Sequence, residues 1–138
     1  MSVATFPYVQ INPAFGTAGL SPLVPVTLIS QTMTRQELAL VDSGAAVNVI
    51  PYSLGQQLGA NWDQYPGTIP LAGALGQFPA KPLFLEIVVA SFPAVRMAFA
   101  WSQSPFAKLI LGQVNFFLEF DVCFHRTKGV FEIQPATP

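Results

Sequence analysis

The sequence predicts one globular domain with a mainly β fold; the first of three observations indicates the strands, and the other two indicate the globular domain. Short apolar runs with the length of strands recur along the chain, and glycine, proline or small polar residues separate them. Apolar residues make up 51% of the chain, which excludes disorder. A length of 138 residues is enough to bury a core without covalent cross-links. We therefore expect a single domain over residues 1–138.

The expected strands follow one another along most of the chain. They lie at residues 23–29, 36–41, 47–50, 83–89, 95–101, 109–111, 121–125 and 130–134. Three pairs of strands predict hairpins, which are joined by residues 30–35, 91–93 and 126–129. Residues 16–22 and 61–66 are turn or loop material. Residues 2–13 either pair at a sheet edge or lie disordered.

Two short helices are expected between the strands. Pro51 stands where the first one begins, residues 52–58 are compatible with a helix, and Gly59 is a C-terminal cap. The second helix covers residues 113–120, because apolar residues recur there at helical spacing. We expect these apolar residues to join the core, with Val114, Phe117 and Leu118 on one face and Phe116 and Phe120 close by.

The charge content excludes several classes of partner. Charged residues make up only 9% of the chain, and the net charge is −1. The chain has no basic patch for nucleic acid and no run of charges for an anionic membrane. The apolar stretch 83–101 is interrupted by Glu86, Pro93 and Arg96, so it predicts strands rather than a membrane span. The first residues lack the features of a signal peptide, and we expect a cytoplasmic protein.

One acidic residue, Asp42, lies between two apolar runs. Residues 38–41 lead into a tight Ser43–Gly44 turn, and residues 47–50 leave it. Asp-Ser-Gly alone predicts only an ordinary loop, since Asp and Ser bond to nearby backbone and glycine tolerates positive φ. The flanking strands favour a carboxylate that is held still for chemistry.

The six residues from Leu40 to Ala45 read Leu-Val-Asp-Ser-Gly-Ala, and they resemble the active-site loop of the aspartic peptidases. That loop has two apolar residues, then Asp, Thr or Ser, Gly, and often Ala. A second family motif, Leu-Ile-Leu-Gly at residues 109–112, follows in the family's order.

The resemblance assigns a role to each matching residue. It implies that Asp42 is catalytic, within an active-site loop of Ser43, Gly44 and Ala45. Ser43 would hold two such loops together through its hydroxyl, and Gly44 would present its backbone to the substrate. The residues that support the site in the second motif are Leu111 and Gly112.

The chain carries only one such loop, whereas two-lobed pepsins carry two, so the resemblance is to the single-lobed retropepsins. It implies a closed, β-barrel-like lobe with one short helix after the apolar-apolar-Gly motif, over a motif-bearing core of about residues 23–133. It also implies a symmetric homodimer, in which two Asp42 carboxylates activate a water that hydrolyses a peptide or protein substrate. Such an aspartic endopeptidase needs no metal or cofactor.

The glycine-rich stretch between residues 68 and 82 predicts a hairpin. It is either an ordinary surface hairpin or, by its place in the chain, the mobile flap that closes over peptide in the resembled family. The tyrosine of pepsin-type flaps is absent, so Gln77 or Phe78 is the nearest covering side chain. The flap candidates are Gly73, Ala74, Leu75, Gly76, Gln77 and Phe78.

The sequence departs from the retroviral pattern at one pair of positions. The residue after Asp-Ser/Thr-Gly-Ala is often Asp there, and the residue after the downstream glycine is often Arg. Here these positions are Ala46 and Gln113. Losing both avoids an unpaired buried charge, and it also removes a contact to substrate and a contact at the dimer interface.

The remaining reactive side chains predict structural roles. Cys123 is the only cysteine, which excludes an intrachain disulfide, and we expect a buried reduced thiol. His125 is the only histidine and has no cysteine pair beside it, so we expect no metal site. Asp63 and Asp121 have no glycine loop around them and are expected to be structural.

Two other functional classes fit the sequence. In the first, the domain keeps the peptidase fold but is catalytically silent and only binds peptides or assembles partners. In the second, Asp42 is a turn residue in an unrelated β fold.

Overall fold

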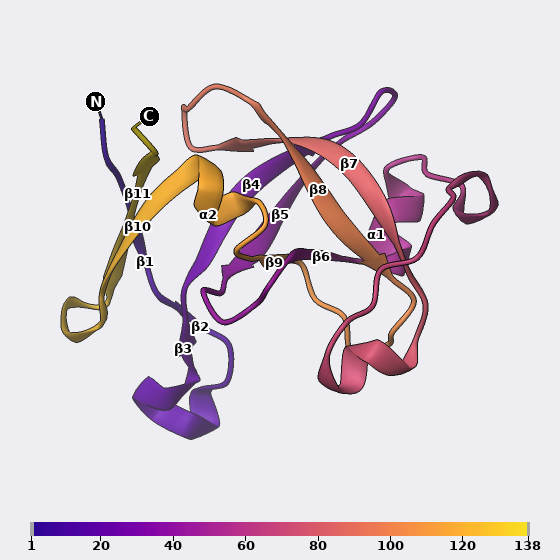
Figure 1. Cartoon of the computed structure of the whole chain (residues 1–138). Helices are drawn as coiled ribbons and strands as arrows, with labels where there is room; N and C mark the ends of the chain where they lie inside the picture. Colours follow the sequence, from indigo (N-terminus) through magenta and orange to yellow (C-terminus); the bar gives the residue numbers. More distant parts are fainter. Residues whose placement is uncertain (1, 138) are drawn as a thin grey trace.

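The computed structural model describes residues 2–137, and a mainly β fold is confirmed (Figure 1). Its centre is a closed barrel of six strands. In order around the barrel these are β4 (Leu23–Ile29), β5 (Thr34–Val41), β9 (Ile110–Leu111), β6 (Asn48–Pro51), β8 (Val95–Ser102) and β7 (Ala80–Val89).

Two predicted hairpins form most of the barrel. β4 and β5 pair antiparallel from Leu23↔Leu40 to Ile29↔Thr34, and β7 and β8 pair antiparallel from Ala80↔Ser102 to Ile87↔Val95. Side chains alternate between the core and the outside along β4 and along β7 from Leu83 onward, as period-2 geometry requires, whereas residues 99–102 of β8 are all buried. The buried set from β4 and β7 is Val24, Val26, Leu28, Leu83, Leu85, Ile87 and Val89.

The short strand β9 lies between β5 and β6. It pairs parallel with β5, with Leu40 opposite Ile110 and Val41 opposite Leu111. It also pairs antiparallel with β6, where Val49 lies opposite Ile110. The chain on both sides of Asp42 is therefore fixed to one segment that comes some 70 residues later in the sequence.

The two ends of the chain form a separate sheet, here called the terminal sheet, in the order β1 (Ala4–Pro7), β11 (Val130–Pro135), β10 (Phe120–His125). The predicted hairpin of β10 and β11 is confirmed, and Gly129 in its turn has a left-handed φ of 69°. Of the two alternatives for residues 2–13, pairing at a sheet edge is the one observed, because β1 pairs with β11. β2 (Val9–Gln10) pairs with β3 (Leu20–Ser21) across the 3-10 helix η1 (Pro13–Gly19).

The first predicted helix is confirmed as α1 (Tyr52–Gln57). Pro51 caps its start, and Gly59 follows it with a φ of 91°, which L side chains rarely adopt. Short 3-10 helices occur in connecting segments at η2 (Trp62–Gln64), η3 (Gly73–Gln77) and η4 (Arg126–Lys128). No helix within residues 2–137 combines the length and the apolar character that crossing a membrane requires.

The second predicted helix is much shorter than expected. α2 (Phe116–Glu119) is a single turn, and Val114 and Leu118 are 49% and 67% exposed rather than in the core. Phe116 and Phe120 are buried instead. The physical reason is that the Val114 carbonyl, which would accept the Leu118 N–H in a longer α-helix, accepts the Asn48 N–H at 2.8 Å instead, and the Leu118 N–H bonds to the carbonyl of Asn115.

The predicted hairpin between residues 68 and 82 is also wrong. Residues 68–79 contain no strand, and η3 lies at the tip of a loop. Ile69 donates its N–H to the carbonyl of Ala80 at 2.8 Å, which closes the base of this loop. Three apolar side chains of this loop pack on the buried barrel residues Val49, Ala80 and Ala100. They belong to Ile69, Leu71 and Leu75. We call residues 69–79 the 69–79 loop.

The prediction that Cys123 is a buried thiol is wrong, because its side chain is exposed. Successive side chains of a strand point to opposite faces. In β10, Phe120 faces the core and Val122 is half-buried, so Cys123 lies on the outer face of the terminal sheet.

Candidate active site

Asp42 directly follows β5, and backbone hydrogen bonds fix the turn that it begins. Its N–H donates to the carbonyl of Leu111 at 3.0 Å, and its own carbonyl accepts the N–H of Ala45 at 3.1 Å. Its carboxylate Oδ1 accepts the N–H of Gly44 at 2.9 Å. The carboxylate is half-exposed, so it is held in place and still open to solvent.

The segment after β9 holds this loop from the other side. Gln113 and Val114 donate their N–H groups to the carbonyls of Ala45 and Ala46, at 2.9 and 3.0 Å, and Asn48 donates its N–H to the carbonyl of Val114 at 2.8 Å. We call residues 42–47 the Asp42 loop and residues 112–115 the 112–115 segment. The two run side by side, so the two short motifs of the sequence form one unit.

Gly112 is required by this close approach. A Cβ atom built at this residue would lie 2.4 Å from the carbonyl oxygen of Val47 and 2.8 Å from that of Ala45. Real Cβ contacts of that length essentially never occur, and the obstructing atoms belong to backbone. Glycine is therefore needed here for space, which is why the apolar-apolar-Gly motif ends on it.

The side chain of Gln113 gives a further contact to the Asp42 loop. Its Nε2 donates to the carbonyl of Ser43 at 2.8 Å. Ser43, Gly44 and Ala46 are exposed, Ala45 is half-buried and Leu111 is fully buried. The neutral pair Ala46 and Gln113 therefore leaves no buried charge at this place, and Gln113 supports the loop through an amide.

Sequence analysis missed Asn48, which we had included in an apolar run. Asn48 is fully buried. Its Oδ1 accepts the N–H of Gly112 at 2.8 Å, and its Nδ2 donates to the carbonyl of Ala98 at 3.1 Å and lies 3.4 Å from the Oδ1 of Asn115. The one polar residue inside an otherwise apolar strand could have indicated this role, because buried amides need partners.

The residues proposed as flap candidates lie in the 69–79 loop. Gly73, Ala74, Gly76 and Gln77 are exposed, whereas Leu75 and Phe78 are half-buried. Leu75 packs on the same buried cluster as Val47 of the Asp42 loop and Ile110 of β9. The 69–79 loop therefore shares its support with the Asp42 loop.

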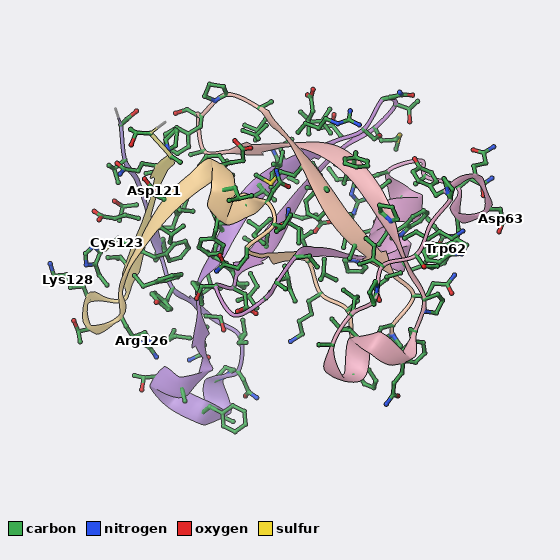
Figure 2. All side chains as sticks on the ribbon, viewed as in Figure 1. Trp62, Asp63, Asp121, Cys123, Arg126 and Lys128 are labelled. Carbon is green, nitrogen blue, oxygen red and sulfur yellow. The ribbon has the colours of Figure 1, made fainter. Side chains whose placement is uncertain are left out.

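The electrostatic surroundings of Asp42 are simple. Within residues 2–137 two ion pairs form, Arg35 with Glu37 and His125 with Glu132, and neither involves Asp42. The other acidic residues considered from the sequence lie elsewhere, Asp63 on η2 and Asp121 on β10, and both are exposed (Figure 2). A half-exposed carboxyl group in this position can accept a proton from water when it is ionised and donate one to a substrate when it is protonated.

A cavity of about 480 Å³ is present at a different place in the fold. It is lined by the β4–β5 turn, the end of α1, the middle of β7 and the start of β8, including Gln31, Gly59, Phe84 and Arg96. No residue of the Asp42 loop or the 112–115 segment lines it. We therefore locate the candidate active site from the hydrogen bonds around Asp42 and not from this cavity.

The comparisons with known proteins concern the fold. No protein-family profile matches the chain, and no curated protein matches it. A crystal structure described as a retropepsin-like aspartic protease from Rickettsia conorii has a TM-score of 0.58 and covers 96% of this chain and 91% of that one. The sequence identity is 15%, so the similarity shows the fold. The predicted architecture, a retropepsin-like lobe built on a closed β-barrel, is confirmed.

Proposed function

We propose that this protein is an aspartic endopeptidase that acts as a homodimer, with one Asp42 from each subunit. The observation that carries the proposal is the Asp42 loop itself. A carboxylate sits at the end of β5, accepts the Gly44 N–H at 2.9 Å, and is held by the 112–115 segment on a retropepsin-like barrel. A surface turn has no need of this support, whereas a catalytic group must be held in position.

The chemistry would follow from two carboxylates that share one proton. Two carboxyl groups that lie close enough to share a proton do not both ionise, because the two negative charges would repel each other. One Asp42 would therefore be ionised and the other protonated. The ionised carboxylate takes a proton from a water between the two, and the oxygen of that water attacks the scissile carbonyl. The protonated carboxylate gives its proton to the carbonyl oxygen. The first carboxyl then gives the proton that it took from water to the leaving nitrogen, the C–N bond breaks, and a hydroxyl of the tetrahedral intermediate returns a proton to the second carboxylate, which regenerates the pair.

Exposed apolar side chains beside the site support pairing of two copies. Val114, on the 112–115 segment, is 49% exposed, and Leu118, on α2 just after it, is 67% exposed. Apolar side chains of this size are favoured at the centre of homodimer interfaces. A symmetric interface through this region would bring each Asp42 toward its symmetry mate, and the Ser43 hydroxyls could then bond across it.

The 69–79 loop is the segment that we propose as the cover over bound peptide. Its exposed tip and its support next to the Asp42 loop suit that role. The substrate would bind as an extended strand, with Gly44 offering its backbone as a hydrogen-bonding edge. Gln77 and Phe78 are the side chains of the loop that would contact it.

The test is digestion of a diverse peptide library from about pH 3 to 8, a range that brackets a pair of carboxylates. Wild type and Asp42→Asn are compared side by side, and sedimentation reports the oligomer under the same conditions. We expect cleavage by wild type only, in the samples that contain dimer. Asp63→Asn, a change of an exposed acid on η2, serves as the matched control and should cleave like wild type.

Two outcomes contradict the proposal. A folded dimer that cleaves no peptide at any pH would favour the silent binding or assembly module with the same fold. Equal cleavage by wild type and Asp42→Asn would show that another residue, or a contaminant, is responsible.

A further inference from the structure

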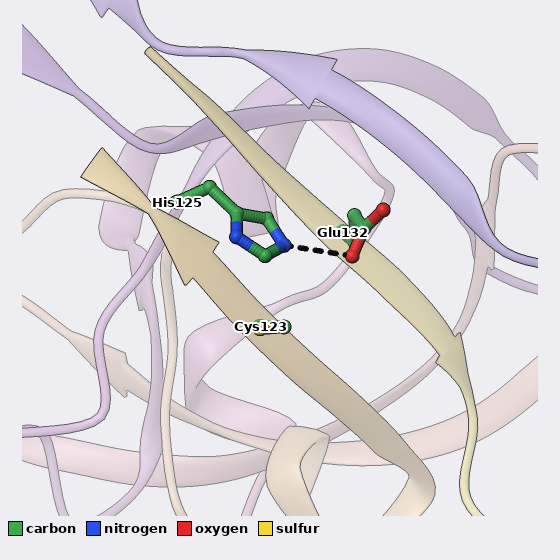
Figure 3. A group of neighbouring side chains, drawn as sticks. All are labelled: Cys123, His125 and Glu132. Atoms are coloured by element: carbon green, nitrogen blue, oxygen red, sulfur yellow. Dashed lines mark hydrogen bonds and ion pairs between the residues drawn. The ribbon is translucent and has the colours of Figure 1, made fainter. Parts of the chain in front are cut away.

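Three metal-ligating side chains meet on the outer face of the terminal sheet, away from the Asp42 loop. They are Cys123 and His125 on β10 and Glu132 on β11. One ligand atom from each lies within 4.8 Å of the other two. The Nε2 of His125 and the Oε1 of Glu132 are 2.8 Å apart, and Figure 3 shows the imidazole directed at the carboxylate.

The strand register explains why these three residues meet. Cys123 lies directly opposite Glu132 in the antiparallel pair, and His125 is two residues further along β10 on the same face. Directly opposite residues have Cβ atoms roughly 5 Å apart. The sequence did not reveal the cluster, because Glu132 approaches only when the hairpin closes.

We propose that Cys123, His125 and Glu132 form a binding site for a thiophilic divalent cation of the zinc class. Thiolate, imidazole and carboxylate are the three ligand types that Zn²⁺ takes in proteins, at about 2.3, 2.0 and 2.1 Å. A tetrahedral ion with such bonds holds its ligand atoms roughly 3.3–3.8 Å apart. The present separations of up to 4.8 Å reach that range through small rotations of the exposed Cys123 side chain and the half-exposed His125 and Glu132 side chains.

Calcium and magnesium do not suit this set of ligands. Both are hard cations that prefer six or more oxygen ligands, whereas the cluster offers one carboxylate together with sulfur and nitrogen. Three protein ligands leave a fourth position open. A hollow of about 130 Å³, lined by Cys123, Glu132, Asp121 and Gln134 among others, lies beside the cluster and gives room for a metal-bound water.

Binding of the ion is a proton exchange. The Cys123 thiol loses its proton and its sulfur bonds to the cation, and His125 binds through the Nε2 lone pair while its proton resides on Nδ1. The hydrogen bond between His125 and Glu132 is replaced by two bonds to the ion. No oxidant or reductant is needed. The site joins β10 to β11, so occupancy would stabilise the terminal sheet.

The test uses Co²⁺ as a spectroscopic probe on the reduced, chelator-treated protein without any added histidine tag. We expect a sulfur-to-cobalt charge-transfer band that saturates at one equivalent per chain and disappears when Zn²⁺ is added. Cys123→Ser should abolish the band. His125→Gln and Glu132→Gln should each weaken Co²⁺ binding by more than the roughly 10–100-fold that loss of a supporting partner costs.

Asp63→Asn is the matched control, because Figure 2 shows Asp63 on the opposite side of the molecule from Cys123. A second measurement needs no variant: Zn²⁺ should slow alkylation of Cys123 in the wild-type protein at least tenfold, because the sulfur lone pair that attacks the reagent is engaged in the bond to the ion. Absence of the charge-transfer band together with unchanged alkylation would overturn the proposal. Equal Co²⁺ affinity of wild type and Cys123→Ser would overturn it as well. Neither outcome bears on the role of Asp42.

Discussion

Asn48 and Gly112 are 64 residues apart in the chain, and the Oδ1 of Asn48 accepts the backbone N–H of Gly112 at 2.8 Å. The same buried side chain donates to the carbonyl of Ala98 at 3.1 Å. One amide therefore ties β6, β8 and the turn after β9 together directly behind the Asp42 loop. The geometry of the candidate active site depends on this buried contact as well as on its exposed residues.

Replacement of Asn48 by leucine should lower the free energy of unfolding by about 1–3 kcal/mol. The change keeps a side chain of similar size but leaves the buried N–H of Gly112 without its acceptor. Chemical denaturation monitored by tryptophan fluorescence measures the effect. Gln57→Leu, on the exposed side of α1, is the control and should stay within about 0.5 kcal/mol of wild type. Equal stability of Asn48→Leu and wild type would disprove the role given to Asn48.

Replacement of Gln113 by leucine should loosen the Asp42 loop with little effect on global stability. The variant loses the hydrogen bond from Nε2 to the carbonyl of Ser43, which lies at an exposed position. We expect faster backbone amide exchange in residues 42–47, and a roughly tenfold lower kcat/KM if the peptidase proposal holds. Gln113→Lys retains a donor and should restore most of the protection. Wild-type exchange rates in Gln113→Leu would contradict this prediction.

Gly55→Ala should destabilise the protein, although Gly→Ala inside a helix ordinarily stabilises it by about 1 kcal/mol. A Cβ atom at Gly55 would lie 2.3 Å from the Nε1 of Trp101, whose N–H donates to the carbonyl of Tyr52 at 3.0 Å. Trp101 is fully buried and cannot move away freely. We expect a loss of about 1–3 kcal/mol in thermal or chemical unfolding.

The control for this change is Ser53→Ala, at an exposed position of the same helix, where no such contact exists. It should leave the stability near that of wild type or raise it slightly. A more stable Gly55→Ala variant would show that the packing of α1 against Trp101 is looser than described.

The 69–79 loop should become protected when peptide binds. If the peptidase proposal holds, the Asp42→Asn variant should bind a peptide without cutting it, so hydrogen exchange is compared with and without a peptide selected from the library. We expect slower exchange in residues 72–78, which a covering segment would contact. The turn at η4, residues 126–129, is the internal control and should not change. If exchange in residues 72–78 is as unchanged as in residues 126–129 at saturating peptide, the proposal that the 69–79 loop covers bound peptide is wrong.

Much of the strand pattern could be predicted because it depends on local sequence. β4, β5, β7 and β8 carry alternating or continuous apolar residues between turn residues, and they lie within a few residues of their expected bounds. α1 was predictable for the same reason, since Pro51 and Gly59 mark its two ends. The candidate catalytic residue was found from a short motif whose flanks are strands.

The predictions that were wrong concern segments whose structure is set by contacts with residues far away in the sequence. The apolar spacing of residues 113–120 predicts two turns of helix, but the Val114 carbonyl that the Leu118 N–H would need accepts the N–H of Asn48. Residues 68–79 predict a hairpin from their glycines, but their apolar side chains pack onto the barrel and the chain bends into η3. Cys123 is exposed because β10 lies in a sheet with one open face.

The sequence by itself determined the mainly β class and most strands, and it indicated Asp42 as the candidate residue for the proposed site. Only the tertiary structure decided that β9 lies between β5 and β6, that Asn48 supports Gly112, and that Cys123, His125 and Glu132 meet on one face. The physical reason is that the periodicity of apolar residues and the preferences of turn residues reflect interactions between near neighbours in the chain. Pairings between distant segments depend on closure of the barrel and the terminal sheet, which no local pattern encodes.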